Sequence, residues 1–123
     1  MTHVKSQIDF DSAFVAHILW KARFRASITR EQAMDVAAIE SDRCCELGQW
    51  LYEDGQRQYG SRPEFTALIE KHKDFHQAAG QVAQLINSRN YAEATRHMEL
   101  GSSFDAKSLQ TGLAISALKV AVG

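Results

Sequence analysis

The sequence is poor in the residues that interrupt helices and in those that mark extracellular proteins. It contains a single proline and two cysteines in 123 residues. The cysteines are neighbours, Cys44 and Cys45, and adjacent helical residues point about 100° apart, so a disulfide between them would be strained. We therefore expect reduced thiols, at most one of them buried and bound to a ligand. Reduced thiols are typical of a cytoplasmic protein.

Long apolar runs and an excess of positive charge are also missing. No apolar run approaches the ~20 residues needed to cross a bilayer. The opening residues, MTHVKSQIDFDS, lack the apolar core of a signal peptide. The formal net charge is -1 and no arginine run stands out, which argues against a nucleic-acid partner. We expect a cytoplasmic protein with no membrane insertion, and the initiating Met1 favours a free-standing chain.

The composition is that of one globular domain. Apolar residues make up 45% and charged residues 24% of the 123 residues, and no low-complexity tract or internal repeat is visible. A chain of this length can bury a core without disulfide support. We therefore expect residues 1–123 to form a single domain.

The apolar spacing predicts helices throughout, and no alternating strand pattern persists beyond a few residues. We expect long helices over about 9–27, 41–55, 63–88 and 91–120, the last bent near Gly101. Pro63 suits the first turn of a helix and Gly55 its end. Thr29 with Gln32 offers a capping box for a short helical turn between the first and second long helices. The predicted fold is all-α: an antiparallel four-helix bundle with a short extra helical turn between the first and second long helices.

Histidines interrupt the apolar rows of two predicted helices. His72 and His76 are four residues apart, so their imidazoles lie one turn apart on the same face. That face also carries Phe65, Leu68, Ile69, Ala79, Val82 and Ile86. His17 interrupts a similar row made of Phe10, Phe14, Phe24 and Ile28. We therefore expect all three histidines to face the core.

Three inward histidines and one thiol are the donor set of a closed tetrahedral zinc site. A lone histidine on an apolar face is more often a hydrogen-bonded core residue, but burying His72 beside His76 costs desolvation twice. Imidazole nitrogen and one thiolate favour zinc over magnesium, calcium or manganese, although copper has the higher intrinsic affinity. A di-iron site is disfavoured because inward Glu-x-x-His pairs are absent. On spacing alone, a metal site and a histidine-containing core remain open alternatives.

The thiol ligand must be either Cys44 or Cys45. Gly48 lies one turn beyond Cys45 on the same face and is expected to leave room for a metal. The start of the second predicted helix also stabilises a thiolate. Cys44 falls on an apolar face of that helix, so its expected role is small core filler. We assign Cys45 as the ligand and expect His3 and His97 to lie outside the site.

Three short segments together resemble one known family. The segment 45–51, CELGQWL, is similar to its Cys-x-[aromatic or Leu]-Gly-x-Trp element. The segment 17–21, HILWK, resembles its first-helix histidine followed by Trp-Lys, and 72–76, HKDFH, resembles its His-x-x-x-His pair. The family is the chemoreceptor zinc-binding domain, abbreviated CZB, and the resemblance covers about residues 8–120.

This resemblance implies a Zn²⁺ ion bound by His17, Cys45, His72 and His76. The family is attached to bacterial chemoreceptors and diguanylate cyclases, where it senses zinc or reactive oxidants and alters output. This sequence contains no methyl-accepting coiled coil and no cyclase domain, so a signal is expected to pass in trans to a receptor, kinase or cyclase. Some members are dimers, and a homodimer is a further expectation here. The extra Cys44 is a departure from the family pattern.

Two other functions remain open. A structural adaptor or dimerisation module is one, because apolar residues cover more than one face of the last helix: Leu109, Leu113, Ile115, Leu118, Val120 and Val122. A zinc hydrolase is the other, and it needs an open coordination position and a general base. The helix lacks His-Glu-x-x-His, and Asp74 is predicted to point away from the histidine face. We therefore expect a non-enzymatic protein.

Overall fold

The computed structural model describes residues 8–123, and every regular element within that range is a helix. His3 lies outside the described residues. The all-α class predicted from the spacing is confirmed. The helices are α1 (Phe10–Ile18), α2 (Trp20–Arg30), α3 (Val36–Glu40), α4 (Glu46–Tyr52), α5 (Asp54–Tyr59), α6 (Pro63–Asn87), α7 (Tyr91–Arg96) and α8 (Ser103–Val122).

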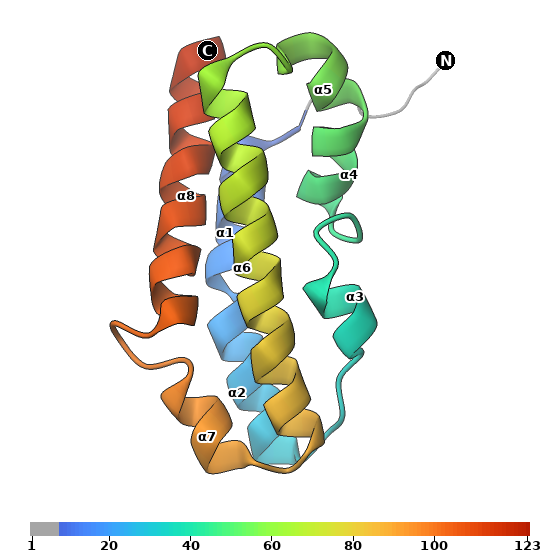
Figure 1. Cartoon of the computed structure of the whole chain (residues 1–123), viewed down its shortest axis with the longest axis vertical. Helices are drawn as coiled ribbons and strands as arrows, with labels where there is room; N and C mark the ends of the chain where they lie inside the picture. Colours follow the sequence, from blue (N-terminus) through green and yellow to red (C-terminus); the bar gives the residue numbers. More distant parts are fainter. Residues whose placement is uncertain (1–7) are drawn as a thin grey trace.

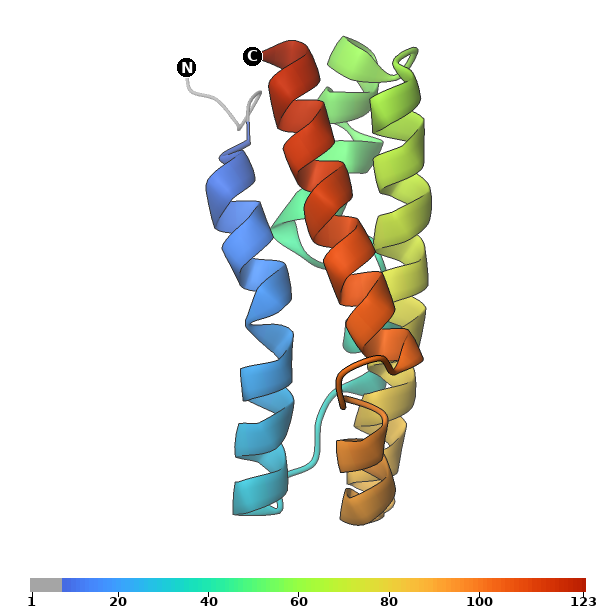
Figure 2. The same cartoon turned by 90° about the vertical axis from the view of Figure 1, so that its left-hand side faces the viewer.

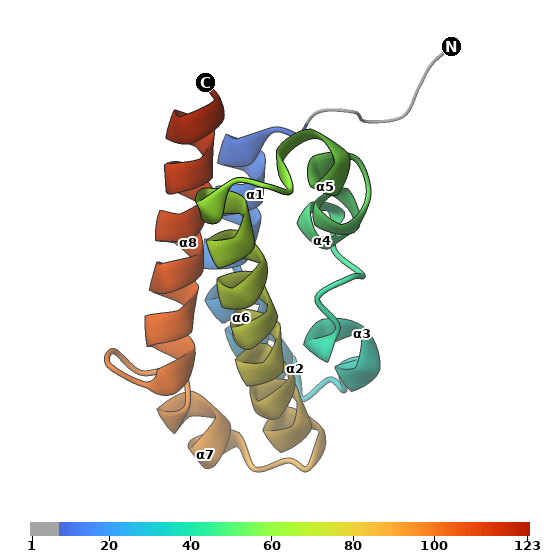
Figure 3. The same ribbon diagram turned by 45° about the horizontal axis from the view of Figure 1, so that its top comes forward.

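Helix α6 lies at the centre of the molecule (Figure 1). The α1–α2 rod leads away from the end that holds the C-terminus, and α3, α4 and α5 return along one side of α6 (Figure 1). Helix α6 then leads away again, and α8 returns after α7. Figure 2 shows the α1–α2 rod facing α8, and α8 packs against both α1 and α6. Figure 3 shows α3, α4 and α5 on the side of α6 opposite to α8.

The first predicted helix is interrupted once, at Leu19, between α1 and α2. Asp9 caps α1, because its carboxylate accepts hydrogen bonds from the backbone N–H groups of the first turn. The capping box at Thr29 and Gln32 is wrong, since α2 continues to Arg30. The short helix α3 begins instead after Asp35, whose carboxylate accepts a hydrogen bond from the third residue of the helix.

The predicted start and the predicted end of the second helix are both wrong. Residues 41–45 form a turn, and α4 begins only at Glu46 with Cys45 as its N-cap. Gly55 lies inside α5 and does not end a helix. A Cβ at Gly55 would lie 2.8 Å from atoms of the Trp50 ring. The glycine is therefore required by the close approach of an indole, which the local sequence does not reveal.

The last predicted helix is divided and not merely bent. Helix α7 ends at Arg96, and α8 begins after Ser102, whose hydroxyl accepts a hydrogen bond from the backbone N–H of Asp105 at 3.1 Å. Gly101 has a φ of 84°, a left-handed conformation that a helix cannot continue through. A serine cap directly after this glycine starts a new helix.

The core consists of two apolar clusters that α6 connects. One cluster gathers around Phe24, Phe75 and Phe104, and the other around Leu51, Phe65 and Leu118. The face of α6 predicted to be buried is buried, except that Ile69 is half-buried. His72 and His76 sit on this face where the two clusters meet. Among the described residues, no helix is both long and apolar enough to cross a bilayer.

Candidate metal centre

Four side chains from three separate segments converge beside the middle of α6. His17 comes from the last turn of α1, Cys45 from the start of α4, and His72 and His76 from α6. One ligand atom from each lies within 4.8 Å of all the others. The three histidines are at most 2% exposed, so the prediction that they face the core is confirmed.

The spacing around the thiol fits a tetrahedral metal. The Sγ atom of Cys45 lies 3.2 Å from Nε2 of His72 and 3.6 Å from Nε2 of His76. Zinc–sulfur and zinc–nitrogen bonds at the tetrahedral angle place sulfur and nitrogen about 3.5 Å apart. The observed separations bracket this value, so the two imidazoles and the thiol could share one ion with little movement.

Backbone carbonyls orient two of the three imidazoles. Nδ1 of His17 donates to the carbonyl oxygen of Ala13 at 2.7 Å, and Nδ1 of His76 donates to that of Ile39 at 2.7 Å. A proton held on Nδ1 leaves the lone pair of Nε2 free for a metal. Outer hydrogen bonds of this kind fix the ring orientation and the tautomer that a metal-binding histidine needs.

An unsatisfied nitrogen marks the centre of the cluster. Nε2 of His17 is buried and has no hydrogen-bond partner among the described residues, and its other nitrogen is already bonded to Ala13. A buried polar atom without a partner costs about 1–3 kcal/mol. A bound metal would remove this cost. Nδ1 of His72 also lacks a partner, and that ring is held by packing, with its centroid 4.5 Å from that of His76 and 5.0 Å from that of His17.

The imidazoles are neutral at pH 7. Burial lowers the pKa of His17 to about 4 and that of His72 to about 2, and burial also lowers the pKa of His76. Neutral imidazole is the form that binds a metal. Burial raises the pKa of the Cys45 thiol, so this group carries its proton until a metal displaces it.

The turn that carries Cys45 is fixed by contacts with α4. Sγ of Cys45 accepts a hydrogen bond from the Gly48 N–H at 3.3 Å, which caps the helix. The Tyr52 hydroxyl donates to the Asp42 carboxylate, and the Arg43 guanidinium lies 3.8 Å from the centre of the Tyr52 ring. Burial raises the pKa of Tyr52 to about 12, so the hydroxyl keeps its proton at neutral pH. These contacts position the thiol beside α6.

The structure changes the role of Gly48. A Cβ at this position would collide with the backbone carbonyl of Asp42. Gly48 therefore admits the turn that precedes α4, a requirement that the sequence did not reveal. The prediction that Cys44 is core filler is wrong, since its side chain is exposed. This error follows from treating residues 41–45 as helix.

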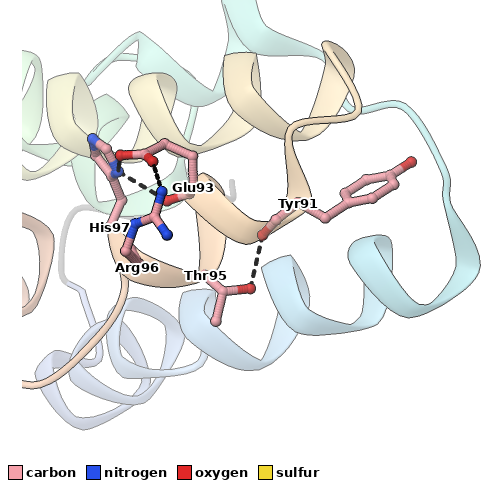
Figure 4. Close-up of polar contacts among 5 residues, drawn as sticks. All are labelled: Tyr91, Glu93, Thr95, Arg96 and His97. Atoms are coloured by element: carbon pink, nitrogen blue, oxygen red, sulfur yellow. Dashed lines mark hydrogen bonds and ion pairs between the residues drawn. The ribbon is translucent and has the colours of Figure 1, made fainter.

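His97 lies apart from the cluster, as expected. Its Nδ1 donates to the backbone carbonyl of Glu93 at 2.9 Å, and the Glu93 carboxylate pairs with Arg96 (Figure 4). Glu93 and Arg96 belong to α7, and His97 is the C-cap of that helix. His97 is half-exposed and contributes no atom to the metal candidate.

Sequence reasoning missed the groups that orient the ligands. The carbonyls of Ala13 and Ile39 are backbone atoms, and a backbone acceptor has no signature in the residue type. The Tyr52 hydroxyl and the Asp42 carboxylate are ten residues apart. A tyrosine and an aspartate at this distance form no recognisable motif.

The sequence profile of the chemoreceptor zinc-binding domain (CZB) matches residues 17–83, more than half of the 123-residue chain. The chain belongs to this family. The CZB match begins at His17 and includes Cys45, His72 and His76, and it is shorter than the predicted resemblance over 8–120. No curated protein and no solved structure matches the chain. The family is a zinc-binding sensory module and not a catalytic one, so this chain is a zinc-binding signalling domain that contains a His₃Cys cluster.

Proposed function

We propose that His17, Cys45, His72 and His76 bind one Zn²⁺ ion as a closed four-ligand site. The observation that carries this proposal is the buried Nε2 of His17, which has no partner and belongs to a cluster of donors within 4.8 Å of one another. Zinc suits this set because it accepts imidazole nitrogen and thiolate sulfur in tetrahedral geometry. Four protein donors leave no position for a catalytic water, which supports a non-enzymatic role.

The ion would join segments that lie far apart in the sequence. It links α1, α4 and α6, and Cys45 is the only proposed ligand outside α1 and α6. Loss of zinc or of this thiolate would free the turn over residues 41–45 and the start of α4, while Leu47 and Leu51 stay packed in the core. We infer that the state of the site sets the position of this segment, and that this position is the signal.

The signal that changes the site is zinc itself or a thiol-reactive oxidant. The Cys45 sulfur would be deprotonated when it binds zinc, and a thiolate attacks peroxide or hypochlorous acid. With peroxide, the sulfur forms a bond to one oxygen, the O–O bond breaks, and hydroxide leaves. The resulting sulfenic acid is a poorer ligand than a thiolate, so the ion would be released.

The proposed setting is a cytoplasmic signalling system. Residues 1–123 would form a single domain, with the α1–α2 rod, the α3–α5 segment, α6 and α8 as an antiparallel four-helix bundle and α3 as its extra helical turn. The output would pass in trans to a receptor, kinase or cyclase, with no nucleic acid and no membrane insertion. Apolar side chains on α1 and α8 are exposed and support a homodimer: Val15, Ile18, Leu109 and Leu113.

The second candidate function is a structural zinc adaptor without sensing. The same exposed apolar face supports it, because such a face also suits permanent docking. The two functions differ in whether the metal centre responds to zinc concentration or to an oxidant. A sensor releases zinc or changes shape within the range of its signal, whereas an adaptor holds zinc and keeps its thiolate unreactive.

Metal content and ligand substitution test the zinc site. Purified protein weighed by native mass spectrometry should carry one zinc ion, and His17→Ala or His72→Ala should lose it. His97→Ala changes a half-exposed histidine outside the cluster, so it is the matched control and should retain zinc. A zinc-free wild type, or zinc retained in both ligand variants, would refute the site.

Oxidant exposure separates sensor from adaptor. Treatment of the zinc-loaded protein with hypochlorous acid should release zinc and reduce helical content, measured with a chromogenic chelator and by circular dichroism. Cys45→Ser should abolish this oxidant response. Retention of zinc and helicity by the oxidised wild type would favour the adaptor.

A further inference from the structure

A cavity of about 380 Å³ opens beside the thiol side of the candidate metal centre. Its lining includes Cys45 and His76 from the centre, together with Cys44 and residues of α2 and α3. Cys45 is half-buried, whereas the three histidines are buried. Cys45 is therefore the least buried of the four proposed ligands, and the cavity reaches it from outside.

Cys44 brings a second thiol to this same cavity. It is an exposed free cysteine directly before the proposed ligand, and residues 41–45 are not helical, so its side chain is not turned away by a helical register. The cavity leads to a cluster in which Nε2 of His17 is fully buried and unpartnered. An accessible thiol thus stands at the mouth of a centre that contains an unsatisfied donor.

We propose that Cys44 is an auxiliary ligand that binds Zn²⁺ transiently while the ion enters or leaves the centre. This inference rests on the proposed zinc site. A closed four-ligand centre has no open coordination position, so the ion can enter or leave only while one of its four ligands is unbound. The Cys44 thiol is tethered next to Cys45 and has a high effective concentration there, so it can bind the ion while Cys45 is unbound.

The proposed exchange is a ligand substitution without a redox change. During uptake, the Cys44 thiol loses its proton to water, and its sulfur forms a bond to the hydrated ion as one bound water leaves. Cys45 then loses its own proton and takes over the ion. The Cys44 sulfur is released and regains a proton from water. Release of the ion follows the same steps in reverse.

Other roles for Cys44 fit the geometry less well. A disulfide to the adjacent Cys45 would be strained. The charged groups around the cavity also select no charged organic ligand. The Arg23 guanidinium is stacked on the ring of Trp20 at 3.8 Å. The Asp35 carboxylate accepts a hydrogen bond from the first turn of α3. The positive and the negative side chain of the cavity lining therefore already have partners within the protein.

Exchange kinetics test the proposal. Zinc-loaded wild type, Cys44→Ser and Cys44→Ala are mixed with excess 4-(2-pyridylazo)resorcinol, and zinc release is followed by stopped-flow absorbance. Both Cys44 variants should release and take up zinc severalfold more slowly. Their dissociation constants, from competition with a chelator of known affinity, should equal that of the wild type. Ser27→Ala, which changes another residue of the cavity lining, is the matched control and should exchange at the wild-type rate.

The outcomes separate this inference from the zinc site. Equal exchange rates in the wild type and both Cys44 variants would overturn the auxiliary role and leave the zinc site standing. A loss of affinity in Cys44→Ser as large as that in Cys45→Ser would make Cys44 a permanent ligand and would also overturn it. A wild type that binds no zinc would refute the site itself. Cobalt loading adds a second readout, since the sulfur-to-cobalt absorption band should be the same in wild type and Cys44→Ser.

Discussion

The Nδ1 atom of His76 lies 2.7 Å from the carbonyl oxygen of Ile39, so a proposed ligand on α6 is oriented by the backbone of α3. This contact requires the two helices to approach closely. Gly80, one turn after His76, provides the space, because a Cβ there would lie 2.5 Å from the Cβ of Glu40. The packing of α3 on α6 and the orientation of the imidazole therefore depend on one another.

Gly80→Ala is expected to weaken zinc binding without changing any ligand. The added methyl group would push α3 away from α6 and lengthen the hydrogen bond between His76 and Ile39. Loss of an outer hydrogen bond to a metal-binding histidine typically lowers affinity by about 10–100-fold. Chelator competition measures this change.

A substitution of an exposed residue on the same helix controls for general effects on α6. Gln77→Ala lies one turn before residue 80 and is exposed. It should leave zinc affinity unchanged. Wild-type affinity in Gly80→Ala would show that the α3 contact does not orient His76.

Much of this arrangement follows from periodicity. The inward face of α6 was predictable because its apolar residues repeat at helical spacing and Pro63 marks its start. The same spacing placed His72 and His76 in the core. Spacing alone could not predict that His17 and Cys45 converge on this pair. That prediction came from the three segments that resemble the family.

The start of α4 was not predictable from local sequence. Ser41 and Asp42 are good N-cap residues, and nothing local favours Cys45 over them. The structure uses both side chains differently. The Ser41 hydroxyl accepts a hydrogen bond from the Arg43 N–H, and the Asp42 carboxylate accepts one from Tyr52. A contact within the turn and a contact with Tyr52 of α4 thus decide where the helix begins.

Zinc binding at pH 7 is expected to release about one proton per ion. Burial holds the pKa values of His17 and His72 at about 4 and about 2 and lowers that of His76, so these rings have no proton to lose. Burial raises the pKa of the Cys45 thiol, so this group supplies the proton. Titration calorimetry in buffers of different ionisation enthalpy measures the number released.

The pH dependence of this count distinguishes buried from ordinary histidines. Exposed histidines, with a pKa near 6.5, would add protons to the count as the pH falls to 6. Here His17 and His72 should add no proton at pH 6, so at most His76 can raise the count above one, and Cys44→Ser should not change it. A count above two at pH 6 would show that His17 or His72 is protonated before zinc binds.

Asp105 is expected to make stability depend on pH below its ordinary pKa of 3.8. Its carboxylate accepts hydrogen bonds from the Gly101 N–H at 3.1 Å and from the Lys21 ammonium at 3.1 Å, which together tie the start of α8 to α2. The Gly101 contact, and then the Lys21 contact, lower the pKa of Asp105 in the folded protein. The stabilisation is therefore complete above pH 3.8 and is lost as the pH falls through the folded pKa.

Urea unfolding of zinc-free protein from pH 7 down to pH 3 tests this contribution. Asp105→Asn should be less stable than wild type at pH 7, and the difference between the two unfolding midpoints should shrink as the pH falls and the wild-type carboxyl takes up its proton. Lys21→Met removes only the ammonium, so it should keep the part of the pH dependence that comes from Gly101. High salt should reduce the wild-type stability but not that of Lys21→Met, because salt screens this half-buried ion pair. A constant difference between wild type and Asp105→Asn across the pH range would show that the carboxylate charge contributes nothing to the junction of α8 with α2.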